Sequence, residues 1–119
     1  MSRILVVDDD KMNIMMATRI LNTKYSDVVA VSSGEECLKE LNDGEYDLVL
    51  LDIEMPGMDG FTTLEKIRAL NNGDDIKVIF LSASMDSEQE ERAKALKAID
   101  FIKKPFMPNL FLEKVGGIL

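Results

Sequence analysis

The segment RILVVDDDK, residues 3–11, joins an apolar run directly to three consecutive carboxylates, Asp8, Asp9 and Asp10. The branched residues of the run suit a buried strand. Two carboxylates about 4 Å apart repel each other by roughly 4 kcal/mol at the effective dielectric of a protein surface. A carboxylate cluster at the end of a core strand therefore needs a compensating charge, and the rest of the chain offers candidates for it.

Apolar runs of this kind alternate with segments of helical period along the whole chain. Continuous apolar runs, without strict alternation, are typical of strands that are covered on both faces in a parallel sheet. Five strand–helix units in a row predict an α/β fold with a doubly wound, five-stranded parallel sheet and helices on both faces. The strands are predicted at residues 3–7, 27–31, 47–51, 76–81 and 100–103, and the helices at residues 11–22, 34–42, 60–70, 87–97 and 108–118.

Local signals support the helix assignments. Asp10 is suited to cap the first helix. Ser87 and Glu90 have the spacing of a capping box, and Pro108 is a favoured first-turn residue. Most of the eight methionines are expected to fill the core, those of residues 12–16 on the apolar side of the first helix.

Composition excludes several classes of protein. The 119 residues suit one domain, residues 1–119, and the net charge of −8 argues against direct binding to nucleic acid. No apolar run approaches the roughly 20 residues of a membrane span. The single cysteine, Cys37, is expected in the core, and a cytoplasmic protein without membrane association is predicted. The chain has no histidine, which removes the commonest general base and zinc ligand.

The charge is distributed unevenly. Six of the fourteen basic residues lie in residues 92–119, where Asp100 and Glu113 are the only acidic ones. The last quarter of the chain is therefore locally basic, which suits either solvated surface or a docking face.

Reactive side chains follow the predicted strands. Asp8 and Asp9 follow the first strand, Asp52 the third, Ser82 the fourth, and Lys104 the fifth. Because parallel strands end at one edge of the sheet, these residues are expected to converge there. The carboxylates are suitable ligands for Mg²⁺, and a carboxylate can also attack phosphorus. A lysine and a hydroxyl could stabilise a transferring phosphoryl group.

Four separated motifs carry a resemblance that covers essentially the whole chain. They read VVDD, LLDIEMPGMDG, FLSAS and FIKKPF in that order, and they resemble the receiver domain of two-component response regulators. The resemblance implies a flavodoxin-like (βα)5 fold with strand order 2-1-3-4-5. It also implies a signalling switch that accepts a phosphoryl group from a sensor histidine kinase or a phosphotransfer protein, and not an enzyme acting on other substrates.

The resemblance also implies roles for single residues. Asp52 matches the phosphoacceptor. Asp8 and Asp9, together with Asp52 and the backbone carbonyl of Glu54, match the ligands of Mg²⁺ or Mn²⁺. Glu54 and Ser84 occupy positions that tune the lifetime of the phosphoryl group.

Further implied roles concern the response to phosphorylation. Ser82 and Phe101 match the switch pair, and Lys104 matches the catalytic lysine. The output face is expected within residues 87–118, where a partner or a second copy would bind. Lys97 departs from the family pattern, because many relatives have a helix-ending glycine there.

Two alternatives remain open on the sequence. Asp8-x-Asp10 also resembles the motif of a haloacid dehalogenase-type phosphatase, although Met12 does not fit that motif and the chain is short for that fold. A receiver-like binding module that is never phosphorylated is the second alternative, and the complete acidic set argues against it.

Overall fold

The computed structural model describes residues 2–119, and it contains the five predicted strand–helix units. The strands are β1 (Arg3–Val7), β2 (Asp27–Val31), β3 (Leu48–Asp52), β4 (Val78–Ser82) and β5 (Asp100–Lys103). The helices are α1 (Lys11–Leu21), α2 (Gly34–Asp43), α3 (Gly60–Arg68), α4 (Ser87–Ala95) and α5 (Pro108–Ile118), with a short 3-10 helix, η1, at Gly73–Asp75.

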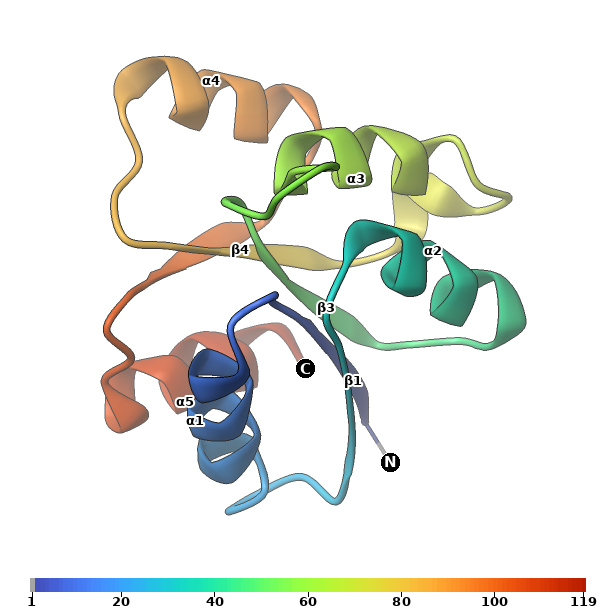
Figure 1. The fold of residues 1–119 in the computed structure, drawn as a ribbon. Coiled ribbons are helices and arrows are strands. Elements are labelled where there is room, and N and C mark those ends of the chain that lie inside the picture. The colour runs from blue at the N-terminus through green and yellow to red at the C-terminus, as the bar shows by residue number, and fades with distance from the viewer. Residues whose placement is uncertain (1) are drawn as a thin grey trace.

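The strands form one parallel sheet in the order β2-β1-β3-β4-β5, which confirms the predicted fold and strand order. Figure 1 shows α2, α3 and α4 on one face of this sheet and α1 and α5 on the other. Val7 pairs with Leu51, and Ser82 pairs with Lys103. The register therefore brings the carboxyl ends of β1, β3, β4 and β5 to the same edge.

Each face of the sheet has its own core, because side chains alternate along a strand. Leu5 and Val7 of β1 contribute to the cluster under α2, α3 and α4, whereas Ile4 and Val6 contribute to the cluster under α1 and α5. Burial of β1 and β3 on both faces explains why their sequences are continuous apolar runs. The two cores hold the strand ends rigidly.

Most predicted boundaries lie within two residues of the observed ones. The third strand is shifted by one residue and includes Asp52, and the fourth begins at Val78, two residues later than predicted. The third helix ends at Arg68 and the fourth at Ala95, two residues earlier than predicted. The fourth helix ends as it would with glycine, because Lys97 adopts a left-handed conformation with φ of 63°. This conformation costs an L-residue roughly 1–2 kcal/mol.

Two local predictions were wrong. The capping box of α4 is formed by Asp86 and Gln89, one residue before the predicted pair of Ser87 and Glu90. Met12, Met15, Met16 and Met107 are exposed, and Met55 alone among the methionines of residues 2–119 is buried. The side chains of Ala17 and Leu21 fill the space beneath α1, so its methionines remain at the surface.

Cys37 lies in the core beneath α2, as predicted. Within residues 2–119, none of the helices has the length and apolar character required to cross a bilayer.

Candidate functional site

An acidic pocket lies at the carboxyl edge of the sheet. Asp8 follows Val7, and because Val7 pairs with Leu51, Asp8 lies beside Asp52 at the end of the neighbouring strand. The pocket has a volume of about 210 Å³. It is lined by Asp8, Asp9, Asp10, Asn13, Asp52, Glu54, Ala83 and Lys104.

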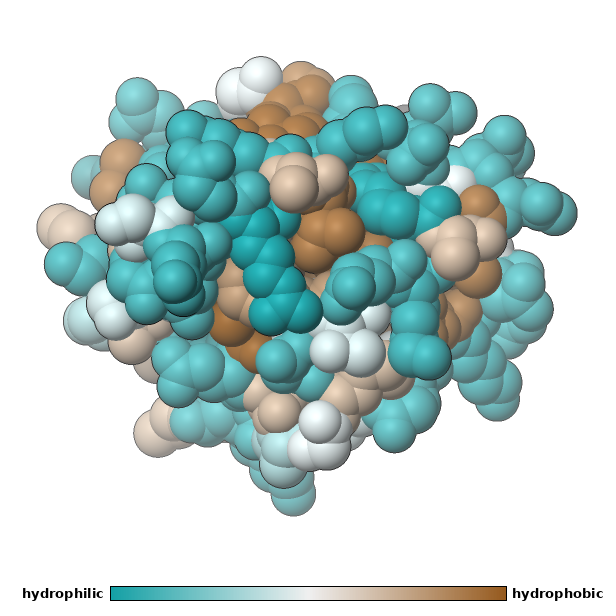
Figure 2. Space-filling view, turned by 90° about the horizontal axis from the view of Figure 1, so that it is seen from above, coloured by the Kyte–Doolittle hydropathy of each residue, from teal (hydrophilic) through white to brown (hydrophobic). Residues whose placement is uncertain are grey.

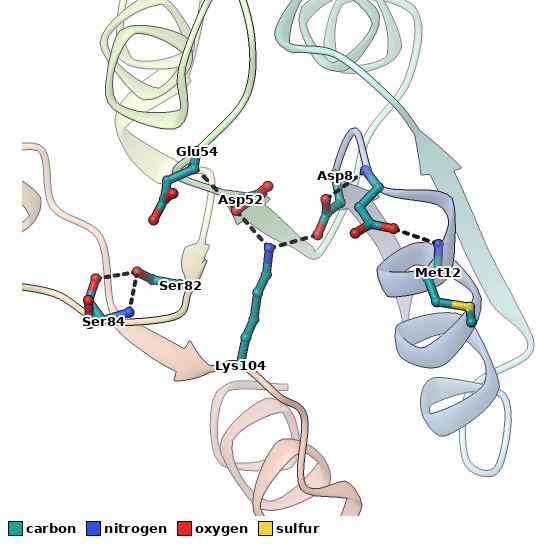
Figure 3. Close-up of polar contacts among 8 residues, drawn as sticks. Asp8, Met12, Asp52, Glu54, Ser82, Ser84 and Lys104 are labelled. Atoms are coloured by element: carbon teal, nitrogen blue, oxygen red, sulfur yellow. Dashed lines mark hydrogen bonds and ion pairs between the residues drawn. The ribbon is translucent and has the colours of Figure 1, made fainter.

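Lys104 bridges two buried carboxylates (Figure 3). Its Nζ lies 2.9 Å from Asp52 Oδ1 and donates a hydrogen bond to it, and the same Nζ lies 3.1 Å from Asp8 Oδ2. Asp52 Oδ1 also accepts a hydrogen bond of 3.3 Å from the backbone N–H of Glu54. Lys104 is placed by its own backbone N–H, which donates to the carbonyl of Ser82 across the β4–β5 edge. One ammonium group is thus shared between two carboxylates.

The pKa values reflect this crowding. Burial, and then the nearby charge of Asp8, raise the pKa of Asp52 to about 6 against the opposing effect of Lys104. Burial alone would lower the pKa of Lys104, but its contacts with Asp52 and Asp8 together outweigh burial and raise that pKa. The lysine is therefore held in its charged form, while a negative charge on Asp52 is costly without further neutralisation.

The donor set fits a hard divalent cation. Asp8, Asp9 and Asp52 each offer a carboxylate oxygen, and these three atoms lie within 4.8 Å of one another. Asp8 Oδ2 is buried, and its close approach to Lys104 lacks the geometry of a hydrogen bond, so this oxygen is without a hydrogen-bond partner. An unsatisfied buried oxygen in an all-oxygen cluster with excess negative charge is suited to Mg²⁺ or Mn²⁺.

Local backbone structure positions these carboxylates. Asp8 Oδ1 accepts a hydrogen bond of 3.0 Å from the backbone N–H of Asp10. Asp10 in turn caps α1, because its Oδ1 accepts from the backbone N–H of Met12 at 2.9 Å, as predicted. On the other strand, Gly60 lies against the main chain of Asp52 and Ile53, where a Cβ atom would collide with both.

The predicted switch residues are not aimed at the pocket. Ser82 is buried at the end of β4, but its hydroxyl donates to the carbonyl of Ser84 at 2.6 Å and accepts from the N–H of Ser84 at 3.2 Å. Figure 3 shows both serines turned away from Asp52. Phe101 lies partly buried on β5, under the ammonium group of Lys114. Glu54 is exposed and lines the pocket.

The sequence interpretation missed Asn13 as a pocket residue. Asn13 lies on the first turns of α1 and lines the pocket together with Asp9 and Asp10. Its signal was its place in the first turn of a helix that begins at residue 11, directly after the acidic residues that end at the capping Asp10.

Known proteins share both the sequence pattern and the fold. The chain matches the response regulator receiver domain family over residues 4–116. It is 33% identical to the regulatory protein VanRB of Enterococcus faecalis over 117 residues, which cover 98% of this chain and 52% of VanRB. The chain therefore spans about half the length of this curated relative.

Solved structures give the same result. The chemotaxis protein CheY4 of Vibrio cholerae superimposes with a TM-score of 0.94 at 25% identity, over 100% of this chain and 99% of that one. The N-terminal domain of a response regulator receiver protein from Methanoculleus marisnigri has a TM-score of 0.81 at 36% identity, covering 98% and 95%. Because the family model matches residues 4–116, and the fold agrees with it, this chain belongs to the receiver domains of two-component response regulators.

Proposed function

We propose that Asp52 is the phosphoacceptor of this receiver domain and that its donor is a phosphohistidine of a sensor histidine kinase or a phosphotransfer protein. The observation that carries the proposal is the placement of Lys104, whose Nζ lies 2.9 Å from Asp52 and 3.1 Å from Asp8. An ammonium group in this position can stabilise the charge of a phosphoryl group arriving at Asp52.

The transfer requires no further covalent chemistry from the protein. A carboxylate oxygen of Asp52 attacks phosphorus, a P–O bond forms, the P–N bond to the donor imidazole breaks, and the imidazole nitrogen keeps the electron pair. Asp8, Asp9, Asp52 and the backbone carbonyl of Glu54 would hold Mg²⁺ or Mn²⁺, which would neutralise charge on the phosphoryl group when bound. Among the side chains, Lys104 provides the fixed positive charge.

The signal depends on contacts that form only with the phosphoryl group. The hydroxyl of Ser82 bonds a phosphoryl oxygen after leaving Ser84, and Phe101 moves with it. Glu54, which lines the pocket, and Ser84, which follows the pocket residue Ala83, adjust how long the phosphoryl group survives. The domain catalyses only its own phosphorylation and dephosphorylation, and the buried free thiol of Cys37 fits a reducing, cytoplasmic setting.

Labelling with acetyl phosphate tests the assignment of Asp52. The intact chain should gain one phosphoryl group with Mg²⁺ present and none with a chelator, and Asp52→Asn should gain none. Asp59→Asn is the matched control, because Asp59 caps α3 and asparagine caps equally well. Unchanged labelling of Asp52→Asn would disprove the assignment. Sustained hydrolysis of an external phosphate ester would instead favour the phosphatase alternative. Failure to bind Mg²⁺ would favour the alternative of a receiver-like binding module that is never phosphorylated.

The output surface consists of α4, β5 and α5. A groove of about 230 Å³ lies between α4 and β5, with Ala93, Ala98 and Phe101 among its lining residues and Lys94 at its side. Ile99, which also lines the groove, is 49% exposed. An apolar floor bordered by charges of both signs, Lys94 with Glu90 and Asp100, suits a partner protein or a second copy of this domain.

Charge reversal tests this surface. Lys94→Glu should weaken partner binding or self-association of the phosphorylated domain, because it leaves only acidic charges among the described residues that line the groove and removes the cation there that an acidic group of the partner could meet. Lys39→Glu makes the same charge change on α2, where Lys39 is exposed, and should have no effect. Equal binding by both variants and the wild type would remove α4 from the output surface.

A further inference from the structure

Helix α4 differs from its neighbour α3 in how it is held to the domain. α3 buries Phe61, Leu64 and Ile67, whereas α4 buries Ala93 alone. Figure 2, which views the face formed by α2, α3 and α4, shows a surface that is mostly hydrophilic. With so little apolar burial, the position of α4 depends largely on polar contacts.

The most extensive of these polar contacts comes from Arg68 at the end of α3. Its Nε donates to the carbonyl of Leu96 at 2.8 Å, and its Nη2 donates to the carbonyl of Lys97 at 3.0 Å. Its Nη1 donates to the carbonyls of Gly73 and Ile76, at 2.6 and 2.7 Å. The guanidinium group therefore links the end of α4 to the connection between α3 and β4.

All four acceptors of Arg68 are main-chain oxygens, and within residues 2–119 no carboxylate forms an ion pair with it. The last carbonyls of a helix have no partners inside that helix. Arg68, the last residue of α3, supplies hydrogen-bond donors to the carbonyls of Leu96 and Lys97, just beyond the end of α4. Its second acceptor, Lys97, is the residue held in the left-handed conformation, so the same contact fixes the turn that ends the helix.

The opposite end of α4 is held in a different way. It joins β4 through residues 83–86, and the hydroxyl of Ser82 bonds both the carbonyl and the N–H of Ser84 in this loop. If Ser82 bonds a phosphoryl oxygen, as the proposed function requires, it must release the carbonyl of Ser84. The loop before α4 therefore loses a contact on phosphorylation, whereas none of the four hydrogen bonds of Arg68 involves Ser82 or Ser84.

We infer that Arg68 is a positioning residue that anchors the carboxyl end of α4 in both states, so that α4 pivots about Leu96 and Lys97 when Asp52 is phosphorylated. The inference rests on the proposed role of Ser82 and adds a fixed point to it. Movement is then concentrated at residues 83–89, at the edge of the groove that forms the output surface. Without the anchor, the signal would be spread into the turn that precedes β5.

Amide hydrogen exchange, resolved by residue, tests this inference with and without acetyl phosphate and Mg²⁺. In the wild type, phosphorylation should alter exchange at residues 83–89 and leave Leu96, Lys97 and Ala98 unchanged. In Arg68→Ala, the carbonyls of Leu96 and Lys97 lose their hydrogen bonds to a charged group, which loosens the turn. The three amides should then exchange at least about tenfold faster and become sensitive to phosphorylation. Arg68→Lys keeps the charge but not the fork of donors, and should be intermediate.

Arg92→Ala is the matched control. Arg92 also joins α4 to α3, through Glu65 at 3.3 Å and over the ring of Phe61, but it contacts side chains only. Its loss should leave exchange at Leu96, Lys97 and Ala98 close to the wild type.

Three results would overturn the inference: unchanged exchange at these amides in both Arg68 variants, equally faster exchange throughout β1 and β3, or a wild type in which phosphorylation alters both ends of α4 alike. Absence of phosphoryl incorporation in the wild type counts against the proposed function instead. The comparison of unphosphorylated Arg68 variants then still decides whether Arg68 anchors the turn.

Discussion

At the scale of single residues, the carboxylates that suit a metal ion also destabilise the metal-free fold, because they repel one another. Asp8 and Asp52 are both buried and share one lysine, and Asp9 adds a third carboxylate nearby. The raised pKa of Asp52 reflects the cost of its ionised form, caused first by burial and then by Asp8. Function therefore keeps a charge at a position where a neutral side chain would be more stable.

Replacing Asp52 by asparagine should consequently stabilise the metal-free domain by roughly 0.5–2 kcal/mol. Mg²⁺ should raise the stability of the wild type, because a ligand that binds the native state shifts unfolding, and should do so less for Asp52→Asn. Urea unfolding with Mg²⁺ and with a chelator measures both effects. Asp43→Asn, at the end of α2, serves as the control. A metal-free Asp52→Asn variant no more stable than the wild type would contradict the prediction.

At the scale of helices and strands, caps and close approaches fix how each unit meets the site. Asp10, Ser33, Asp59 and Asp86 cap the first four helices through their side chains. The sequence indicated the cap of α1 correctly and placed that of α4 one residue too late. Gly60 marks a constraint of a different kind, because α3 begins directly against the main chain of Asp52. A side chain at residue 60 would displace the end of β3.

Gly60→Ala should therefore destabilise the domain by about 1–3 kcal/mol, the usual cost of overpacking, and should reduce Mg²⁺ affinity by shifting Asp52. Gly117→Ala is the control, since Gly117 lies in α5 with open space around it. That change should raise stability by roughly 0.5–1 kcal/mol through helix propensity. Thermal unfolding and Mg²⁺ titration distinguish the two variants, and equal effects would show that the contact at Gly60 is unimportant.

Element order and the convergence of Asp8, Asp9, Asp52 and Lys104 could be predicted from hydrophobic periodicity and from the geometry of parallel sheets, which are local or general. The strand order, in contrast, came only from the resemblance to receiver domains. The hydroxyl direction of Ser82, the exposure of the methionines and the contacts of Arg68 could not be predicted. They depend on which neighbours fill a given space, and no pattern along the chain encodes that.

At the scale of the whole molecule, the sheet separates two hydrophobic cores, and both cores are exposed together when the sheet itself unfolds. Cys37 lies in the core beneath α2 and α3, and burial, followed by the charge of Glu40, raises the pKa of its thiol to about 12. The thiol is therefore both inaccessible and protonated at neutral pH, and it reacts only through the thiolate.

Alkylation of Cys37 should accordingly report the opening of this core. In native buffer the reaction should be slow and should follow the population of open molecules, whereas the urea-unfolded chain should react at the rate of a free thiol. The measurement compares alkylation at increasing urea with unfolding followed by circular dichroism. Rapid labelling of the native domain would show that α2 detaches without unfolding of the sheet.

The excess of carboxylates over ammonium groups in the pocket also affects how donors arrive. The chain carries a net charge of −8, and small phosphoryl donors are anions, so long-range repulsion slows their encounter with Asp52. This repulsion extends about 10 Å at an ionic strength of 0.1 M. Salt should therefore speed the arrival of acetyl phosphate at saturating Mg²⁺, whereas it should slow a protein donor whose histidine lies in basic surroundings. The carboxylates that hold the metal thus discriminate between donors by charge before any contact is made.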